Sequence, residues 1–202
     1  MPKLSLSDVV DVISKSGTPK ATKVSQIKNR PAYSPQTDFY KALREGIADV
    51  HEKGKSKAAL KEILSFLTDQ KKLSNYPDAV KGYTKWWGKK DLVWNSTFSE
   101  VYGFQGIDVG INPELGLLVD GVPHLIKMYF KDESLQKLRV DVVTALMETA
   151  LSPHAEPNCV MGVLDVRRSK LHIGSGDSIT RQKLMKMVDA ELSYIGVLWA
   201  AE

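Results

Sequence analysis

The chain has 202 residues, of which 43% are hydrophobic and 26% are charged, and its formal net charge is +4. This length allows one well-packed core with a small helical appendage, and the composition is that of a soluble globular protein. No apolar run approaches about 18 residues, which excludes a transmembrane helix. The single cysteine, Cys159, excludes an internal disulfide. Because the N-terminus also lacks a signal-peptide pattern, we expect a cytoplasmic protein.

The charge is distributed unevenly along the chain. Residues 1–90 contain 18 Lys and Arg against 9 Asp and Glu, whereas residues 91–202 contain 10 against 15. Such asymmetry is typical of a basic region that binds an acidic partner, most often DNA or RNA. The alternatives are an acidic protein partner, two halves that face each other, or lysines that only solvate helices.

The first ninety residues are predicted to form a basic helical region. Ser5 or Ser7 is suited to cap a helix that runs through Ile13 and closes at Gly17, and Thr37 is suited to cap a later one. We expect Pro77 at the start and Gly88 at the end of the last helix. The predicted helical segments are 5–17, 19–30, 37–54, 56–70 and 77–90.

From residue 91 the hydrophobic period changes from that of helices to that of strands, which predicts a mixed α+β domain over residues 91–202. We expect one irregular strand in 92–104 and a three-strand meander formed by 106–112, 115–119 and 122–130. A helix at 134–151, a strand at 159–166, a short strand at 171–173 and a helix from Ile179 follow. The order is βββ-α-ββ-α. The strand at 159–166 is apolar on both faces, which predicts an interior position in the sheet.

The hairpin of the predicted meander contains one unexpected lysine. With Asp120-Gly121 as a two-residue turn, Val119 faces Val122, and counting along the strands places Glu114 opposite Lys127. This arrangement, from about Tyr76 to Ile173, resembles the core of the PD-(D/E)xK nuclease superfamily, which has the restriction-endonuclease-like fold. The resemblance implies that Pro113-Glu114 stands for the leading acid pair and Lys127 for the catalytic lysine. Two acids would hold Mg²⁺ beside that lysine.

The sequence departs from this family at the second acid, whose position is occupied by Leu125. Glu100 and Asp108 are the candidates for a replacement ligand from earlier strands. Three interpretations remain open: Glu114 and Lys127 form a cross-strand ion pair, they are remnants of a degenerate nuclease site, or they belong to a working one. We expect no metal or other cofactor unless the nuclease interpretation holds, in which case Mg²⁺ is required.

Two further segments are rich in cations. In 82–90, three aromatic residues share one helix face, which predicts burial of the rings and leaves the neighbouring lysines for phosphate. A second cluster, 167–170, follows the predicted interior strand. The candidate nucleic-acid-binding residues are Lys20, Lys23, Lys28, Arg30, Lys85, Lys89, Lys90, Arg167 and Arg168.

These patterns favour a nucleic-acid-associated protein with a nuclease-like core that has lost cleavage. The alternatives are a non-enzymatic interaction module that docks on an acidic protein, and a retained metal-dependent nuclease. The choice between DNA and RNA and the oligomeric state are left open.

Overall fold

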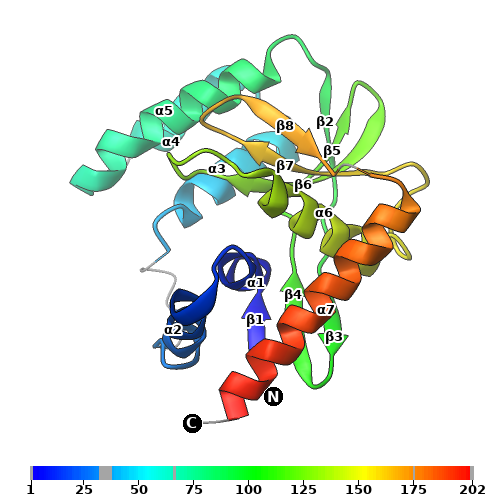
Figure 1. The fold of residues 1–202 in the computed structure, drawn as a ribbon. Coiled ribbons are helices and arrows are strands. Elements are labelled where there is room, and N and C mark those ends of the chain that lie inside the picture. Colours follow the sequence, from blue (N-terminus) through cyan, green and yellow to red (C-terminus); the bar gives the residue numbers. More distant parts are fainter. Residues whose placement is uncertain (1, 32–37, 66, 175, 201–202) are drawn as a thin grey trace.

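The computed structural model describes residues 2–31, 38–65, 67–174 and 176–200, which form two β-sheets flanked by helices (Figure 1). The strands are β1 (Lys3–Ser5), β2 (Leu92–Asn95), β3 (Glu100–Phe104), β4 (Ile107–Ile111), β5 (Leu115–Val119), β6 (Val122–Tyr129), β7 (Val160–Asp165) and β8 (Lys170–Ile173). The helices are α1 (Leu6–Ile13), α2 (Gly17–Lys28), α3 (Lys41–Glu52), the 3₁₀ helix η1 (Lys57–Lys61), α4 (Glu62–Ser65), α5 (Gln70–Trp87), α6 (Lys137–Leu151) and α7 (Ser178–Ala200). Within these ranges, no helix combines the length and the apolar character needed to cross a bilayer.

The larger sheet confirms the α+β class and the order βββ-α-ββ-α. Its strands lie in the order β2-β5-β6-β7-β8, and all neighbours are antiparallel except β6 and β7. Helix α6 makes the crossover between these two parallel strands, and α7 follows β8. Strand β7 is interior, as predicted, and every residue of it after Val160 is buried.

The predicted meander was wrong in its first strand. Segment 92–104 contains two strands, β2 and β3, and β2 pairs with β5 in the larger sheet. Strand β4 instead forms a hairpin with β3 through Gln105-Gly106, which both have positive φ. The N-terminal strand β1 adds to the other edge of β4, so a second sheet of order β1-β4-β3 results. Parallel pairing with β1, more than a hundred residues away, is not readable from local pattern.

The helix ends follow local capping in several places. Ser5 begins α1 through a reciprocal capping box with Asp8, in which Ser5 Oγ accepts from the Asp8 N–H at 3.1 Å. Gly88 ends α5 with a positive φ, as expected. The predicted cap at Thr37 lies outside the described residues, and α3 begins at Lys41.

Two predicted helices begin or break differently. Helix α5 starts at Gln70 because the Asp69 carboxylate accepts from the Lys72 N–H at 2.9 Å, so Pro77 lies inside the helix instead of at its start. The segment 56–70 is not one helix. It forms the 3₁₀ helix η1 and the single turn α4, and the tighter 3₁₀ winding buries two consecutive residues, Ala59 and Leu60.

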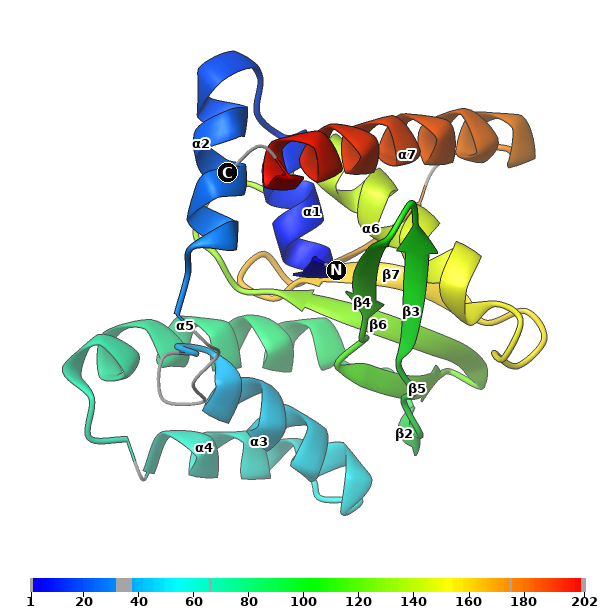
Figure 2. The ribbon, with the colours of Figure 1, turned by 90° about the horizontal axis from the view of Figure 1, so that it is seen from below.

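The larger sheet lies between two layers of helices, which give it two separate hydrophobic clusters (Figure 2). Helices α3, η1 and α5 pack on one face, whereas α1, α2, α6, α7 and the smaller sheet pack on the other. Alternate residues of β6 face opposite clusters, since Leu125 belongs to one and Ile126 to the other. Both clusters draw residues from both sides of residue 90, so the boundary predicted there coincides with neither core.

Candidate functional site

Glu114 and Lys127 meet across the β5–β6 hairpin with the register expected from the sequence. Val119 pairs with Val122 and Leu115 with Ile126, and the Glu114 N–H continues the ladder by donating to the Ile126 carbonyl at 3.0 Å. Lys127 Nζ lies 2.6 Å from Glu114 Oε1. The lysine stands on the face of β6 that Leu125 shares, because side chains alternate along a strand.

The polar groups of this pair are satisfied within the protein. Lys127 Nζ also donates to the carbonyl and the side-chain oxygen of Asn112, at 2.8 and 3.2 Å. Glu114 Oε2 accepts from the Met128 N–H at 2.7 Å. The ammonium group has three donors, and three acceptors surround it. The Lys127 and Glu114 side chains are only 14% and 16% exposed, so the expectation that Lys127 faces solvent was wrong. The residue has been enclosed by the β4–β5 connection.

The residues around this pair do not fit a magnesium ion. Mg²⁺ takes six oxygen ligands, and protein sites supply them chiefly through carboxylates. Leu125, at the second acid's position, is 4% exposed and packs into the cluster that contains α1 and α6. Both oxygens of Glu114 are occupied by protein donors. Within the described ranges, no group of three His, Cys, Asp or Glu side chains is placed to hold a metal.

The two candidate replacement ligands lie elsewhere. Glu100 is at the start of β3, where its carboxylate is 3.7 Å from His154 Nε2. Asp108 is at the hairpin end of β4, opposite Gly103, and four residues of strand separate it from Asn112 by about 13 Å. Neither has a printed contact with Lys127 or Glu114, both of whose listed polar partners are other residues.

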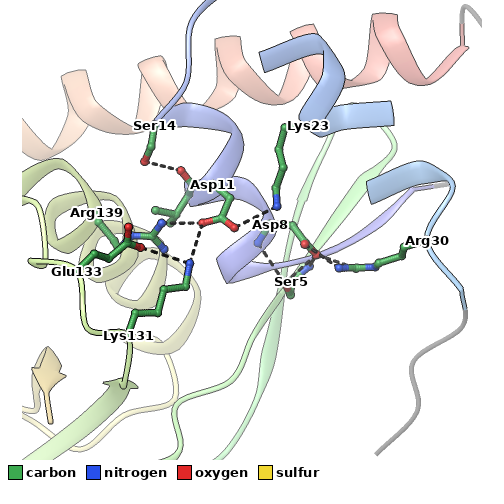
Figure 3. A network of polar contacts seen from close by, with 10 residues as sticks. Ser5, Asp8, Asp11, Ser14, Lys23, Arg30, Lys131, Glu133 and Arg139 are labelled. Carbon is green, nitrogen blue, oxygen red and sulfur yellow. Dashed lines mark hydrogen bonds and ion pairs between the residues drawn. The ribbon is translucent and has the colours of Figure 1, made fainter. Parts of the chain in front are cut away.

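The basic residues of the α2 region contact other parts of the protein (Figure 3). Lys20 Nζ lies 2.6 Å from Glu191 in α7, and Lys23 Nζ lies 3.2 Å from Asp11 in α1. Arg30 binds both oxygens of Asp8 at 2.8 Å, and Lys28 donates to the Trp199 carbonyl at 2.9 Å. These four predicted nucleic-acid contacts therefore connect α2 to α1 and α7.

The basic residues of α5 are arranged differently. Lys85 and Lys89 are exposed, and no acceptor for either is found among the described residues. Lys81, which the sequence reasoning missed, is also exposed, and its four-residue spacing from Lys85 was the available signal. Lys90 instead folds onto Trp86, with Nζ 5.2 Å from the ring centroid.

The aromatic residues of α5 are buried, as predicted. Tyr83 and Trp86 are 0% and 4% exposed. Burial raises the pKa of the Tyr83 hydroxyl well above its usual value. That hydroxyl lies 2.8 Å from Nε2 of His51, and burial lowers the pKa of this histidine to about 4. These rings anchor α5 to the core, which holds its lysines on the outer face.

Arg167 and Arg168 follow β7, where a cleft opens between the β7–β8 turn and α5. Arg167 is 11% exposed and donates to the Phe130 carbonyl at 2.8 Å and to Asn75 Oδ1 at 2.9 Å, so it holds the turn against α5. Arg168 is 42% exposed and lies 3.4 Å from the buried Asp165 carboxylate. The cleft also contains Lys81 and Lys85. Arg168 is therefore the more accessible of the two arginines.

No protein-family model and no curated protein matches the chain. The fold is similar to the crystal structure of a protein from Eubacterium rectale described as a "putative exonuclease". That match has a TM-score of 0.53 and 12% sequence identity, and it covers 99% of this chain and 82% of the other. At this identity the similarity shows a nuclease-like fold and nothing more specific.

Proposed function

We propose that this chain is a nucleic-acid-associated protein with a degenerate PD-(D/E)xK core that no longer cleaves. The nuclease-like fold supports the first part of this proposal. Glu114 and Lys127 stand where the resemblance places the leading acid and the lysine, at a separation of 2.6 Å. Leu125 stands where the second acid is required, and its side chain is part of the hydrophobic core.

The loss of cleavage follows from the electrostatics of the remaining pair. One carboxylate beside one ammonium group has no net charge, so a divalent cation gains little there in return for its hydration shell. Lys127 is also held by three protein acceptors, and a lysine in this state is not available to orient a water molecule. The pair instead joins the residue after β4 to the β5–β6 hairpin.

The observation that carries the binding proposal is the row of exposed lysines on α5. Lys81, Lys85 and Lys89 are spaced by four residues and therefore lie along one side of the helix. Arg168 lies across the cleft from Lys81 and Lys85. We call these four residues the α5 ridge. A line of cations without internal partners is suited to the regularly spaced phosphates of a nucleic-acid backbone.

Fluorescence anisotropy with labelled single- and double-stranded DNA and RNA tests this proposal. Binding to at least one of them at about 50 mM salt should weaken steeply as salt increases, with a log–log slope near −0.9 per phosphate neutralised. The double variant Lys85→Ala/Lys89→Ala should flatten that slope by about two units and leave sequence preference unchanged. The matched control is Lys183→Ala/Lys186→Ala, which removes the same charge from α7 and should leave the slope nearly unchanged.

The opposite result is equally informative. Absence of binding at about 50 mM salt, where phosphate contacts are strong, would contradict the nucleic-acid proposal. The α5 ridge would then be assigned to an acidic protein partner. Equal loss of affinity in both double variants would show that net charge matters and the position of the lysines does not.

A further inference from the structure

A second cleft lies on the other side of the larger sheet, between the end of α1, helix α2 and the segment that joins β6 to α6 (Figure 3). Its volume is about 530 Å³. Tyr129, two residues after Lys127 on the same face of β6, lies at its wall. We call it the Asp11 cleft, because the Asp11 carboxylate is the group on which its cations converge.

The Asp11 cleft carries an excess of positive charge. Four of its charged residues are cations and two are acids, namely Lys15, Lys23, Lys131, Arg139, Asp11 and Glu133. Arg139 donates to Asp11 at 2.6 Å, Lys23 Nζ lies 3.2 Å from it, and Lys131 Nζ lies 3.9 Å from it. One carboxylate thus faces three cations. The net charge of the lining is about +2 if each group has its usual charge.

Asp11 organises these cations without neutralising them all. Burial alone would raise the pKa of the Asp11 carboxyl, but the hydrogen bond from Arg139 and the nearby charges of Lys131 and Lys23 keep that pKa below its usual value. The carboxylate is therefore ionised at neutral pH and holds Arg139 in place. Arg139 is also positioned from the other side by the Tyr129 ring, whose centroid is 5.8 Å away.

Two of the lysines keep donors available for a ligand. Lys131 is 51% exposed, and its distances of 3.9 Å to Asp11 and 3.6 Å to Glu133 are too long for hydrogen bonds. Lys15 is exposed, and the described part of the chain contains no acceptor for it. Cations held this close to one another repel, and an anion placed between them relieves that repulsion.

We propose that the Asp11 cleft binds a phosphate group, with Lys15 and Lys131 as its direct donors and Lys23 and Arg139 supplying charge from the wall. A phosphate monoester carries a charge of about −1.5 to −2 at pH 7, which matches the excess of the lining. Its oxygens accept several hydrogen bonds at once, as three converging cations require. This site is distinct from the α5 ridge, which lies on the opposite face of the larger sheet.

Isothermal titration of the full chain with inorganic phosphate tests the proposal, with sodium chloride holding the ionic strength constant. The wild type should bind one phosphate saturably. Lys15→Gln and Lys131→Gln should each weaken binding by about tenfold, the effect of losing one hydrogen bond to a charged group. Lys183→Gln removes the same charge from α7 and should leave the affinity unchanged. Both test residues are exposed, so a thermal melt should show that the variants remain folded.

Absence of saturable binding, or equal weakening by Lys183→Gln, would overturn the proposal. The source of the phosphate is distinguished by comparing a nucleoside monophosphate with an oligonucleotide that lacks terminal phosphates. Competition by the first identifies a small phosphorylated ligand, and competition by the second identifies a backbone phosphate. In either case, Lys85→Ala/Lys89→Ala should leave inorganic phosphate binding intact. Failure at the Asp11 cleft with nucleic-acid binding retained would therefore remove this inference alone.

Discussion

Lys127 Nζ lies 2.6 Å from Glu114 Oε1, and the same ammonium group donates to the Asn112 carbonyl at 2.8 Å. Asn112 immediately follows β4, a strand of the smaller sheet, whereas Lys127 lies within β6 of the larger one. The lysine thus connects the two sheets at the point where the chain passes from one to the other. A residue in the position of a catalytic lysine has a structural role here.

Removing either member of this pair should destabilise the protein. From the sequence, an exposed pair would contribute well under 1 kcal/mol. Because the side chains are only 14% and 16% exposed, we expect Lys127→Met and Glu114→Gln each to cost about 1–3 kcal/mol. Urea unfolding measures the loss. The double variant should cost less than the sum of the single ones, since each single change leaves a partner unsatisfied. Strict additivity would contradict the coupling.

The purified protein should not cut plasmid DNA, single-stranded DNA or RNA in the presence of Mg²⁺ or Mn²⁺. The reason is the Leu125 position, which supplies a buried methyl group where a second carboxylate would be required. Gel assays with and without a chelator provide the measurement. Metal-dependent cleavage that disappears in both Glu114→Ala and Lys127→Ala would reverse the conclusion and require a rearrangement that brings in another acid.

Gly82→Ala should separate α5 from the β7–β8 turn. A Cβ at Gly82 would lie 2.1 Å from the Val166 carbonyl oxygen, a backbone atom that cannot move aside alone. We expect a loss of at least about 1–3 kcal/mol in the free energy of unfolding. The control is Gly196→Ala in α7, where the Cβ would make an ordinary contact at 3.5 Å. That change should stabilise the protein by about 0.5–1 kcal/mol, because alanine favours helix. Similar effects of both substitutions would contradict the close approach.

Stability should decrease between about pH 6.5 and pH 4 because of His51. Its side chain is 4% exposed, and burial lowers its pKa from 6.5 to about 4. In this window the unfolded chain binds a proton at His51 and the folded chain does not, so acidification favours unfolding. Urea unfolding across this range should show a loss that is roughly 2–4 kcal/mol larger in wild type than in His51→Gln. The exposed His154→Gln should follow the wild type. Parallel curves for wild type and His51→Gln would show that the histidine is protonated in the folded state.

The sequence by itself determined the features that depend on neighbours within a few residues. The Asp120-Gly121 turn, in which both residues have positive φ, set the hairpin register and brought Glu114 beside Lys127. The order of elements in the larger sheet was predictable for the same reason, since strand and helix periods and turn residues are local signals. The spacing of Tyr83 and Trp86 likewise identified the buried side of α5.

Only the tertiary structure decided which segments meet. Strand β4 lies in the smaller sheet because β1 pairs with it, and β2 takes the place that local pattern assigned to β4. The lysines of α2 and α5 look alike in the sequence, yet Lys20 is neutralised by Glu191, which is 171 residues away, and Lys85 has no such partner among the described residues. A salt bridge or a strand pairing over that distance depends on how the whole chain packs, and the residues adjacent to it in sequence carry no record of it.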